Sequence, residues 1–309
     1  MSASNEILTS SPVRSVEAVS NSLTRRLTAF LTLAKPEITM MVMISAGVGS
    51  LMATGSLRIS VLIHSVFGIG LLAAGVAALN QYLERDLDSR MRRTARRPLP
   101  AGELTPLQAL VFGVAVSSCG MLYIFLFLNA LTALLGLLTL ITYLGLYTPL
   151  KTKTSLCTFI GAFAGATPVL MGWSAATNSL SLEAWALYAI LFLWQFPHFY
   201  AIGWLYREDY ARVGMRMLPS VGGNDERVTF RLILTMTQLL VITSLLLPLI
   251  ANTGALYSVT AISLGISFYY VAHQTSLQRS KLAAKRLLHA SVIYLPLLYL
   301  FMILDRFNR

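Results

Sequence analysis

Charged residues are scarce in this sequence. Asp, Glu, Lys and Arg together make up 12% of its 309 residues, whereas an average soluble domain carries roughly 25%. Hydrophobic residues reach 56%, and the mean hydropathy is +0.67. This composition excludes an ordinary soluble enzyme. It also excludes a disordered chain, which needs few apolar residues and a high net charge.

Cysteine, histidine and acidic residues are also few. The two cysteines, Cys119 and Cys157, both lie in apolar stretches, so neither a disulfide framework nor a cysteine metal site is expected. The four histidines are scattered from position 64 to position 289, which excludes a local histidine-rich metal motif. With 13 acids against 24 basic residues, the net charge is +11. The positive-inside bias of membrane proteins explains this excess, and we expect no nucleic-acid partner.

Long apolar runs are what the sequence has instead. Nine of them reach or approach the ~20 residues that a helix needs to span a bilayer. The runs are continuous rather than alternating, which disfavours a transmembrane β-barrel. The sequence therefore predicts an all-α integral membrane protein. The expected segments are Ile38–Leu57, Ile59–Leu83, Pro106–Leu128, Leu131–Leu150, Thr154–Ala176, Ala184–Tyr206, Leu232–Ala251, Leu256–Ala272 and Leu287–Leu304.

The basic residues predict an orientation in the membrane. Of the 24 Lys and Arg, 21 fall in the N-terminal region and in the loops after the second, fourth, sixth and eighth segments. The other three, Arg58, Arg306 and Arg309, belong to the opposite side. Because Lys and Arg concentrate in cytoplasmic loops, we expect a cytoplasmic N-terminus.

The N-terminal region differs from the rest of the chain. It is polar and rich in serine, without an apolar stretch of signal-peptide length, so we expect residues 1–30 to form a flexible cytoplasmic tail. Residues 31–309 would then form a single membrane domain. Glu6 and Glu17 argue against a mitochondrial transit peptide, because such peptides are poor in acids. We therefore favour a bacterial inner membrane over a mitochondrial one.

The end of the second segment carries the strongest chemical signal. If the helix continues past the segment, Asn80, Glu84 and Asp88 are spaced at i, i+4 and i+8 and share one face. Carboxylates on one face repel each other unless a cation lies between them. Mg²⁺ suits this arrangement, because it binds one or two carboxylates and completes its shell with phosphate oxygens and water. The alternative is a solvated helix end that binds nothing.

Basic residues near this face suit a diphosphate. Arg93, Arg96 and Arg97 follow directly, and guanidinium groups match the geometry of phosphate oxygens. Lys151, after the fourth segment, is expected on the same side of the membrane. The simpler interpretation is that these residues only follow the positive-inside bias.

A second polar group lies in and after the sixth segment. His198 is at membrane depth, where polar side chains usually face a cavity or the interior of the bundle. A hydrogen-bonded structural histidine is the alternative to a functional one. Tyr206, Asp209 and Tyr210 follow where the segment leaves the membrane.

These motifs together carry a family resemblance. The stretch from Asn80 to Asp88, followed by Arg93-Thr-Ala-Arg-Arg97-Pro-Leu, resembles the first motif of the UbiA-type intramembrane prenyltransferases. Trp194-Gln-Phe-Pro-His198 and Tyr206-Arg-Glu-Asp-Tyr210 resemble the haem-using branch of that family, the protoheme IX farnesyltransferases. The resemblance extends from about Leu33 to Arg309.

The resemblance implies a fold and an activity. The fold is nine transmembrane helices around a central cavity that opens toward the cytoplasmic loops. The activity transfers the farnesyl group of farnesyl diphosphate to a vinyl group of haem B, with addition of water, giving haem O and diphosphate. Haem B is then a substrate, and Mg²⁺ is the cofactor. A haem A-forming enzyme or a terminal oxidase is the implied downstream partner.

The resemblance also implies roles for the residues. Asn80, Glu84 and Asp88 would hold Mg²⁺ with help from Asp209, whereas Arg93, Arg96, Arg97, Lys151, Tyr206 and Tyr210 would contact the diphosphate or haem. His198 would ligate haem iron or assist the water. The wider family has a pair of aspartates where this chain has Asp209 beside Glu208, so the number of Mg²⁺ ions stays open.

Three other interpretations remain at this point. One is a UbiA-type enzyme with an aromatic quinone precursor as acceptor, which would share the first motif. Another is a transporter or channel, although acids at one end of the helices, rather than at the midplane, disfavour it. A third is an assembly factor for a respiratory complex, which would bind without needing Mg²⁺.

Overall fold

The computed structural model describes residues 24–220, 225–251 and 253–308, and these are helical with no strand among them. Nine helices within this part of the chain are long and apolar enough to cross a membrane. Their spans are Pro36–Thr54, Ile59–Asp88, Pro106–Phe127, Ala130–Leu150, Cys157–Thr177, Leu182–Leu205, Glu226–Leu249, Ala255–Gln278 and Lys281–Phe307. The nine predicted segments are confirmed.

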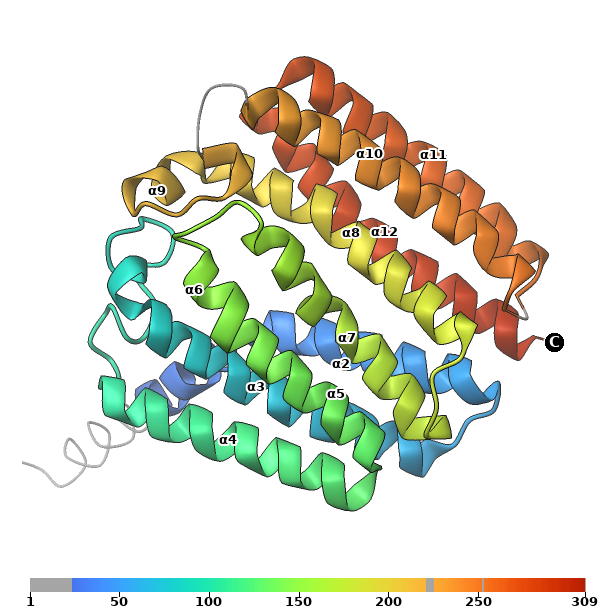
Figure 1. Ribbon diagram of the computed structural model, residues 1–309, viewed down its shortest axis with the longest axis horizontal. Coiled ribbons are helices and arrows are strands. Elements are labelled where there is room, and N and C mark those ends of the chain that lie inside the picture. The colour runs from blue at the N-terminus through green and yellow to red at the C-terminus, as the bar shows by residue number, and fades with distance from the viewer. Residues whose placement is uncertain (1–23, 221–224, 252, 309) are drawn as a thin grey trace, which may run out of the picture.

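In Figure 1 these spans carry the labels α2 (Pro36–Thr54), α3 (Ile59–Asp88), α4 (Pro106–Phe127), α5 (Ala130–Leu140) with α6 (Thr148–Leu150), α7 (Cys157–Thr177), α8 (Leu182–Leu205), α10 (Asp225–Leu246), α11 (Ala255–Gln278) and α12 (Lys281–Phe307). A π-helical stretch, Ile141–Tyr147, joins α5 to α6. The short helix α9 (Arg207–Arg212) follows α8.

Several helix boundaries follow from local sequence signals. α4 begins with a capping box, in which the Thr105 hydroxyl accepts from the Gln108 backbone N–H and the Gln108 side chain accepts from the Thr105 N–H. Ser181 and Ser280 are the N-cap residues of α8 and α12, and the hydroxyl of each accepts a hydrogen bond from a backbone N–H in the first turn of its helix. α2 ends at Gly55, whose left-handed backbone (φ 59°) favours glycine.

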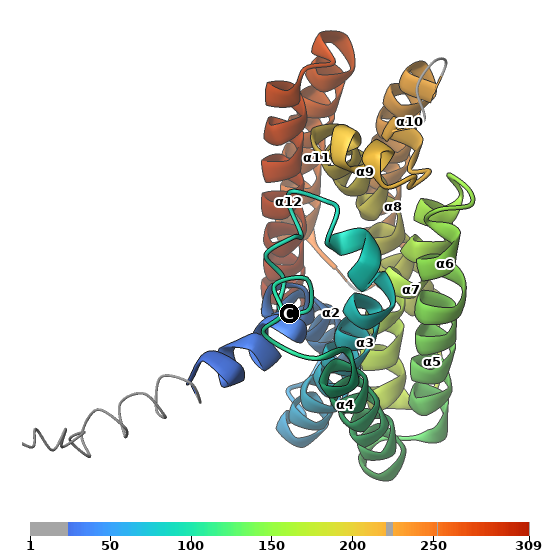
Figure 2. The same ribbon diagram turned by 90° about the vertical axis from the view of Figure 1, so that its left-hand side faces the viewer.

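The helices form one bundle around a continuous apolar core (Figures 1 and 2). α2 packs on α7, α3 on α4, α7 on α8, and α8 on both α10 and α12, while α12 also touches α2. The α2–α7 contact is especially close, because a Cβ on Gly49 would lie 2.1 Å from the Val169 carbonyl oxygen and one on Gly172 would lie 1.8 Å from that of Ala46. Only glycine allows the two backbones to approach this far.

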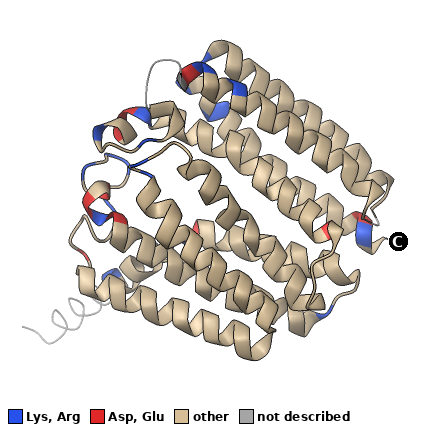
Figure 3. Ribbon diagram, in the orientation of Figure 1, with Lys and Arg blue, Asp and Glu red and all other residues tan. Residues whose placement is uncertain are grey.

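The outer surface of the bundle is apolar, as a lipid-facing surface must be. On α4, for example, Leu107 and Leu126 are 67% and 63% exposed. Figure 3 shows that the charged residues gather mainly at one end of the bundle, near α6, α9 and the end of α3. The chain is therefore a multi-pass integral membrane protein whose charged residues lie mainly at one end.

One predicted helix boundary differs from the structure. α3 continues to Asp88, five residues beyond the apolar run that ended at Leu83, because its last turns are buried by neighbouring segments. Residues 24–33 form a helix that projects from the bundle (Figure 2), and its first seven residues, 24–30, belong to the region expected to be a tail. Residues 1–23 lie outside the described part of the chain.

Candidate active site

A stripe of buried polar side chains lines the last turns of α3. Asn80, Glu84 and Asp88 are 1%, 5% and 1% exposed. The expected helical continuation is therefore present, and the three side chains share one face of α3 as their spacing predicts. Polar groups so deeply buried need partners, because an unpaired carboxylate in an apolar setting is costly.

Three cations from other segments supply these partners. Lys151 Nζ lies 2.5 Å from Glu84 Oε1, and Arg97 Nη1 lies 2.6 Å from Asp88 Oδ2. Lys35 Nζ donates to Asn80 Oδ1 at 2.9 Å. The stripe is therefore a meeting point of four separate parts of the chain. We call these six residues the α3 site.

Lys35 is a member that the sequence interpretation does not include. It lies just before α2, and its backbone is in the left-handed region (φ 48°), which a residue with a side chain adopts only under constraint. Burial, together with repulsion from Arg97, lowers the pKa of Lys35 to about 7. Burial also lowers the pKa of Lys151, but the Glu84 carboxylate, together with Tyr147 and Tyr143, more than offsets burial and raises this pKa above its usual range.

The α3 site suits a complex of a cation and an anion. With Lys35 protonated, three cationic side chains face two carboxylates, which leaves an excess of positive charge for an anion such as diphosphate. Asp88 Oδ1, in contrast, is buried without a hydrogen-bond partner among the described residues. A buried carboxylate oxygen without a partner, on the same face of α3 as the Glu84 carboxylate and the Asn80 amide, is an oxygen ligand of the kind that Mg²⁺ prefers.

A second cluster lies beside the α3 site. The Arg93 guanidinium lies 4.9 Å from the ring centre of Tyr206 and 5.6 Å from that of Tyr210, and it donates to Tyr210 Oη at 3.0 Å. The structure therefore brings Arg93, Tyr206 and Tyr210 into contact with one another. Arg96 is exposed to solvent.

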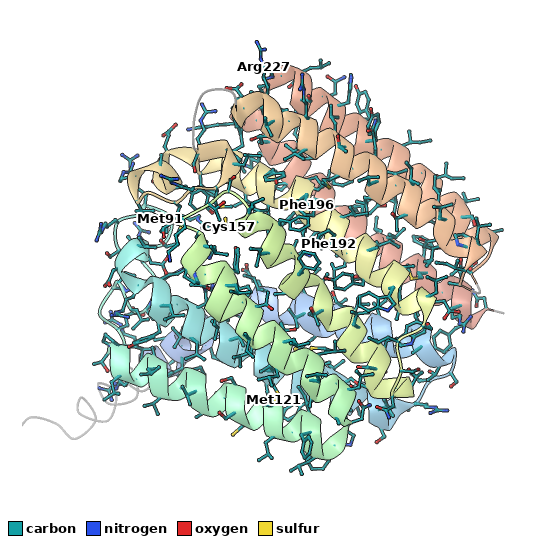
Figure 4. All side chains as sticks on the ribbon, in the orientation of Figure 1. Met91, Met121, Cys157, Phe192, Phe196 and Arg227 are labelled. Carbon is teal, nitrogen blue, oxygen red and sulfur yellow. The ribbon has the colours of Figure 1, made fainter. Side chains whose placement is uncertain are left out.

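The segment containing α9 is packed directly against the α3 site. Tyr210, Met215 and Met217 form one apolar cluster with Met91 and Cys157, and the latter two are labelled beneath α9 in Figure 4. The backbone is tied as well, because the N–H of residue 216 donates to the Lys151 carbonyl at 2.7 Å. The two polar clusters thus share one end of the bundle.

Asp209, which is expected to assist the other carboxylates, lies on α9. It accepts a hydrogen bond from Arg212 at 2.7 Å, one turn along α9. Within residues 24–220, 225–251 and 253–308, no group of three or more His, Cys, Asp or Glu side chains is arranged to hold a metal ion. The α3 stripe therefore offers two carboxylates and the Asn80 amide, without a third carboxylate among the described residues.

His198 lies apart from both clusters, between α8 and α12. Its Nδ1 is 2.8 Å from the Ser291 hydroxyl, and its ring stacks on Trp194 at 4.7 Å. The Trp194 indole N–H in turn donates to the Ser291 carbonyl at 2.8 Å. The structure thus shows a histidine oriented by two neighbours, an arrangement that serves either a structural or a catalytic role.

A glycine of α7 makes room for a polar side chain of α8. A Cβ on Gly165 would lie 2.0 Å from Gln195 Oε1, so the missing side chain makes room for the glutamine of α8. Gln195 donates to the Ala162 carbonyl at 3.0 Å.

Two surface pockets lie near α9 and between α11 and α12. Neither of these two pockets is lined by the predicted site residues, so the central cavity stays a prediction.

Comparison with known proteins places this site in a family. A sequence profile of the UbiA prenyltransferase family matches residues 41–295. The chain belongs to this family and is a membrane prenyltransferase. A solved structure of a digeranylgeranylglyceryl phosphate synthase is similar in fold, with a TM-score of 0.76 at 18% identity over 92% of this chain and 99% of that one. A UbiA homologue from Archaeoglobus fulgidus, bound to GPP and Mg²⁺, has a TM-score of 0.67 at 16% identity over 89% and 99%.

The sequence relatives are more specific. The protoheme IX farnesyltransferase of Solibacter usitatus is 45% identical over 90% of this chain and 98% of its own length. That of Koribacter versatilis is 42% identical over 89% and 92%. Within the UbiA family, the chain belongs with the protoheme IX farnesyltransferases.

Proposed function

We propose that this protein transfers the farnesyl group of farnesyl diphosphate to a vinyl group of haem B, with addition of water, to give haem O and diphosphate. The α3 site carries the proposal, because it places buried carboxylates and an excess of cations at one end of an apolar bundle. An allylic diphosphate has the matching shape, with a charged head and an apolar tail. The sequence relatives supply the acceptor.

The metal belongs to the α3 stripe in this proposal. Asn80, Glu84 and Asp88 would hold Mg²⁺, which the similar A. fulgidus structure contains together with GPP. When bound, the ion would neutralise charge that develops on the departing diphosphate. Asp209 is held by Arg212, so its assisting role is a separate proposal, tested by the turnover of Asp209→Asn.

The basic side chains would stabilise the same leaving group. Lys151 and Arg97 lie within 2.6 Å of the carboxylates that would hold the metal, and we propose that they would also contact the diphosphate. Fixed donors aimed at developing charge are among the largest catalytic effects known in enzymes. Arg93, fixed by the two tyrosines, would close the site from the α9 side, with exposed Arg96 as an outer contact.

Ionisation of the carbon–oxygen bond would release an allylic cation into the apolar part of the bundle. The walls must exclude water until the haem vinyl group attacks, because water would otherwise capture the farnesyl cation. A water molecule then adds to the cation formed on the haem side chain and loses a proton. His198 is the half-buried group that we propose to bind the haem or accept this proton.

The cellular setting follows from the same proposal. The charged end would face the cytoplasm together with the N-terminus, because the N-terminal region and the loops after the second, fourth, sixth and eighth segments hold 21 of the 24 basic residues of the sequence. The membrane would be a bacterial inner membrane, in keeping with the bacterial relatives. A haem A-forming enzyme or a terminal oxidase would take up the product.

A turnover assay tests the proposal as a whole. Purified protein in nanodiscs would be supplied with haem B, farnesyl diphosphate and Mg²⁺, and the products would be identified by mass spectrometry. We expect a haem heavier by one farnesyl group and one hydroxyl, and no product when the metal is chelated. A folded protein that instead prenylates a phenolic acceptor, or transfers to no acceptor, would overturn it.

His198 gives a separate prediction about the acceptor side. We expect His198→Ala to lower haem turnover about 100-fold, the lower end of the range for a group that binds or transfers a proton in the transition state. Farnesyl diphosphate binding should stay unchanged, since His198 lies outside the α3 site. Ser291→Ala is the matched control, because it removes the hydrogen bond but leaves the imidazole. Equal turnover in wild type and His198→Ala would leave this histidine as a link between α8 and α12.

A further inference from the structure

We infer that Thr148 is a positioning residue, which turns the amide oxygen of Asn80 toward the cation position of the α3 site. Thr148 is the first residue of α6, directly after the π-helical stretch, and is 8% exposed. The inference rests on the proposed function, because it gives the Asn80 oxygen a role as a metal ligand. The hydrogen bonds of the two side chains carry the argument.

The single proton of the Thr148 hydroxyl is already used in a hydrogen bond. Thr148 Oγ1 donates to the Tyr143 carbonyl at 2.8 Å, five residues earlier in the chain. The Thr148 backbone N–H also donates to this carbonyl, which is the wide hydrogen bond that defines the π-helix. Since a hydroxyl has only one proton, Thr148 Oγ1 can act toward any further neighbour only as an acceptor.

That further neighbour is the amide of Asn80. Asn80 Nδ2 donates to Thr148 Oγ1 at 3.2 Å, across 68 residues of sequence. The amide of an asparagine has a donor end and an acceptor end, so an acceptor at Thr148 selects the donor end. The acceptor end, Oδ1, must then point the other way, where Lys35 Nζ lies at 2.9 Å. If the amide were turned over, two acceptors would face each other at Thr148 and two donors would face each other at Lys35.

The π-helical stretch explains why Thr148 is available for this role. Its wider turn places Thr148 against Asn80 and, three residues later, Lys151 against Glu84. One short segment therefore contacts two successive members of the α3 stripe. A regular helix over the same residues would rotate the two contacts away from α3, and π-helical turns often occur at functional sites for such reasons.

Metal binding provides the test. Thr148→Val keeps the shape but removes the hydroxyl, whereas Thr148→Ser restores it. With Mn²⁺ as the probe, measured by electron paramagnetic resonance in the presence of a thio-analogue of farnesyl diphosphate, we expect Thr148→Val to bind the metal about 10- to 100-fold more weakly. Thr148→Ser should bind within about threefold of wild type. Turnover of Thr148→Val should recover in part at high Mg²⁺.

A double-mutant cycle separates positioning from a purely structural role. If Thr148 acts through Asn80, then Thr148→Val should weaken Mn²⁺ binding no further in a chain that already carries Asn80→Ala. Additive losses, or a Thr148→Val protein that binds Mn²⁺ as tightly as wild type while Asn80→Ala does not, would overturn the inference. Undiminished binding in Asn80→Ala would instead remove Asn80 from the metal site and so contradict the proposed function. Thermal unfolding of each variant confirms that the compared proteins are folded.

Discussion

Replacing Asp88 by Asn is expected to lower kcat/KM about 1,000-fold, a loss of ~4 kcal/mol in transition-state stabilisation. The substitution keeps the size of the side chain but replaces one carboxylate oxygen with an amide NH2 and removes the buried negative charge. That charge includes Oδ1, which has no hydrogen-bond partner among the described residues. It also leaves Arg97 without its carboxylate. The measurement is turnover of farnesyl diphosphate and haem B across a range of Mg²⁺ concentrations.

The control for this variant lies two residues earlier. Asp86 is on α3 too, but its side chain is 76% exposed and lies 3.8 Å from Arg85, away from the stripe. Asp86→Asn removes the same charge from the same helix, and we expect activity within about twofold of wild type, as for other exposed surface pairs. If Asp88→Asn were as active as Asp86→Asn at limiting Mg²⁺, the metal assignment of the α3 stripe would be wrong.

Gly49→Ala should destabilise the protein by about 3 kcal/mol, the upper end of the usual cost of overpacking. The added methyl group would lie 2.1 Å from the Val169 carbonyl, and a backbone atom cannot move aside as a flexible side chain can. α2 and α7 would have to separate along their whole contact. The loss of stability is measured by unfolding each protein with heat or denaturant in a mild detergent.

Gly47 offers a matched comparison on the same helix. A methyl group there would lie 3.5 Å from the nearest atom, a side-chain carbon of Val66, which is an ordinary contact. Because alanine favours a helix by roughly 1 kcal/mol over glycine, Gly47→Ala should be neutral or slightly stabilising. Similar stability for the two variants would show that the close approach of α2 and α7 is not required.

Much of the fold was predictable because a bilayer restricts the possible structures. Backbone groups in hydrocarbon must be satisfied within the segment, so an apolar run of about 20 residues becomes a helix whatever its neighbours are. The helical face shared by Asn80, Glu84 and Asp88 was predictable for a similar reason, since their spacing is local. The helix ends were less so, because the last turns of α3 are held by Lys151 and Arg97 rather than by their own hydropathy.

The rest of the site depends on contacts across the sequence. No local rule brings Lys35 to Asn80, which is 45 residues away, or turns Arg93 toward tyrosines 113 and 117 positions later instead of toward the neighbouring carboxylates. Thr148 has no ionisable group to draw attention to it. Its role is visible only once the π-helical stretch has set its direction.

The pairing of the buried carboxylates also bears on how the protein is made. Asp88 and Arg97 are nine residues apart, so they can meet as soon as the end of α3 leaves the ribosome. Glu84 can pair with Lys151 only after 67 further residues have been synthesised. An acidic side chain placed in hydrocarbon without a partner costs about 3 kcal/mol during insertion. The last turns of α3 are therefore expected to stay among the lipid headgroups during synthesis, and to become buried only after the fourth span has entered the bilayer.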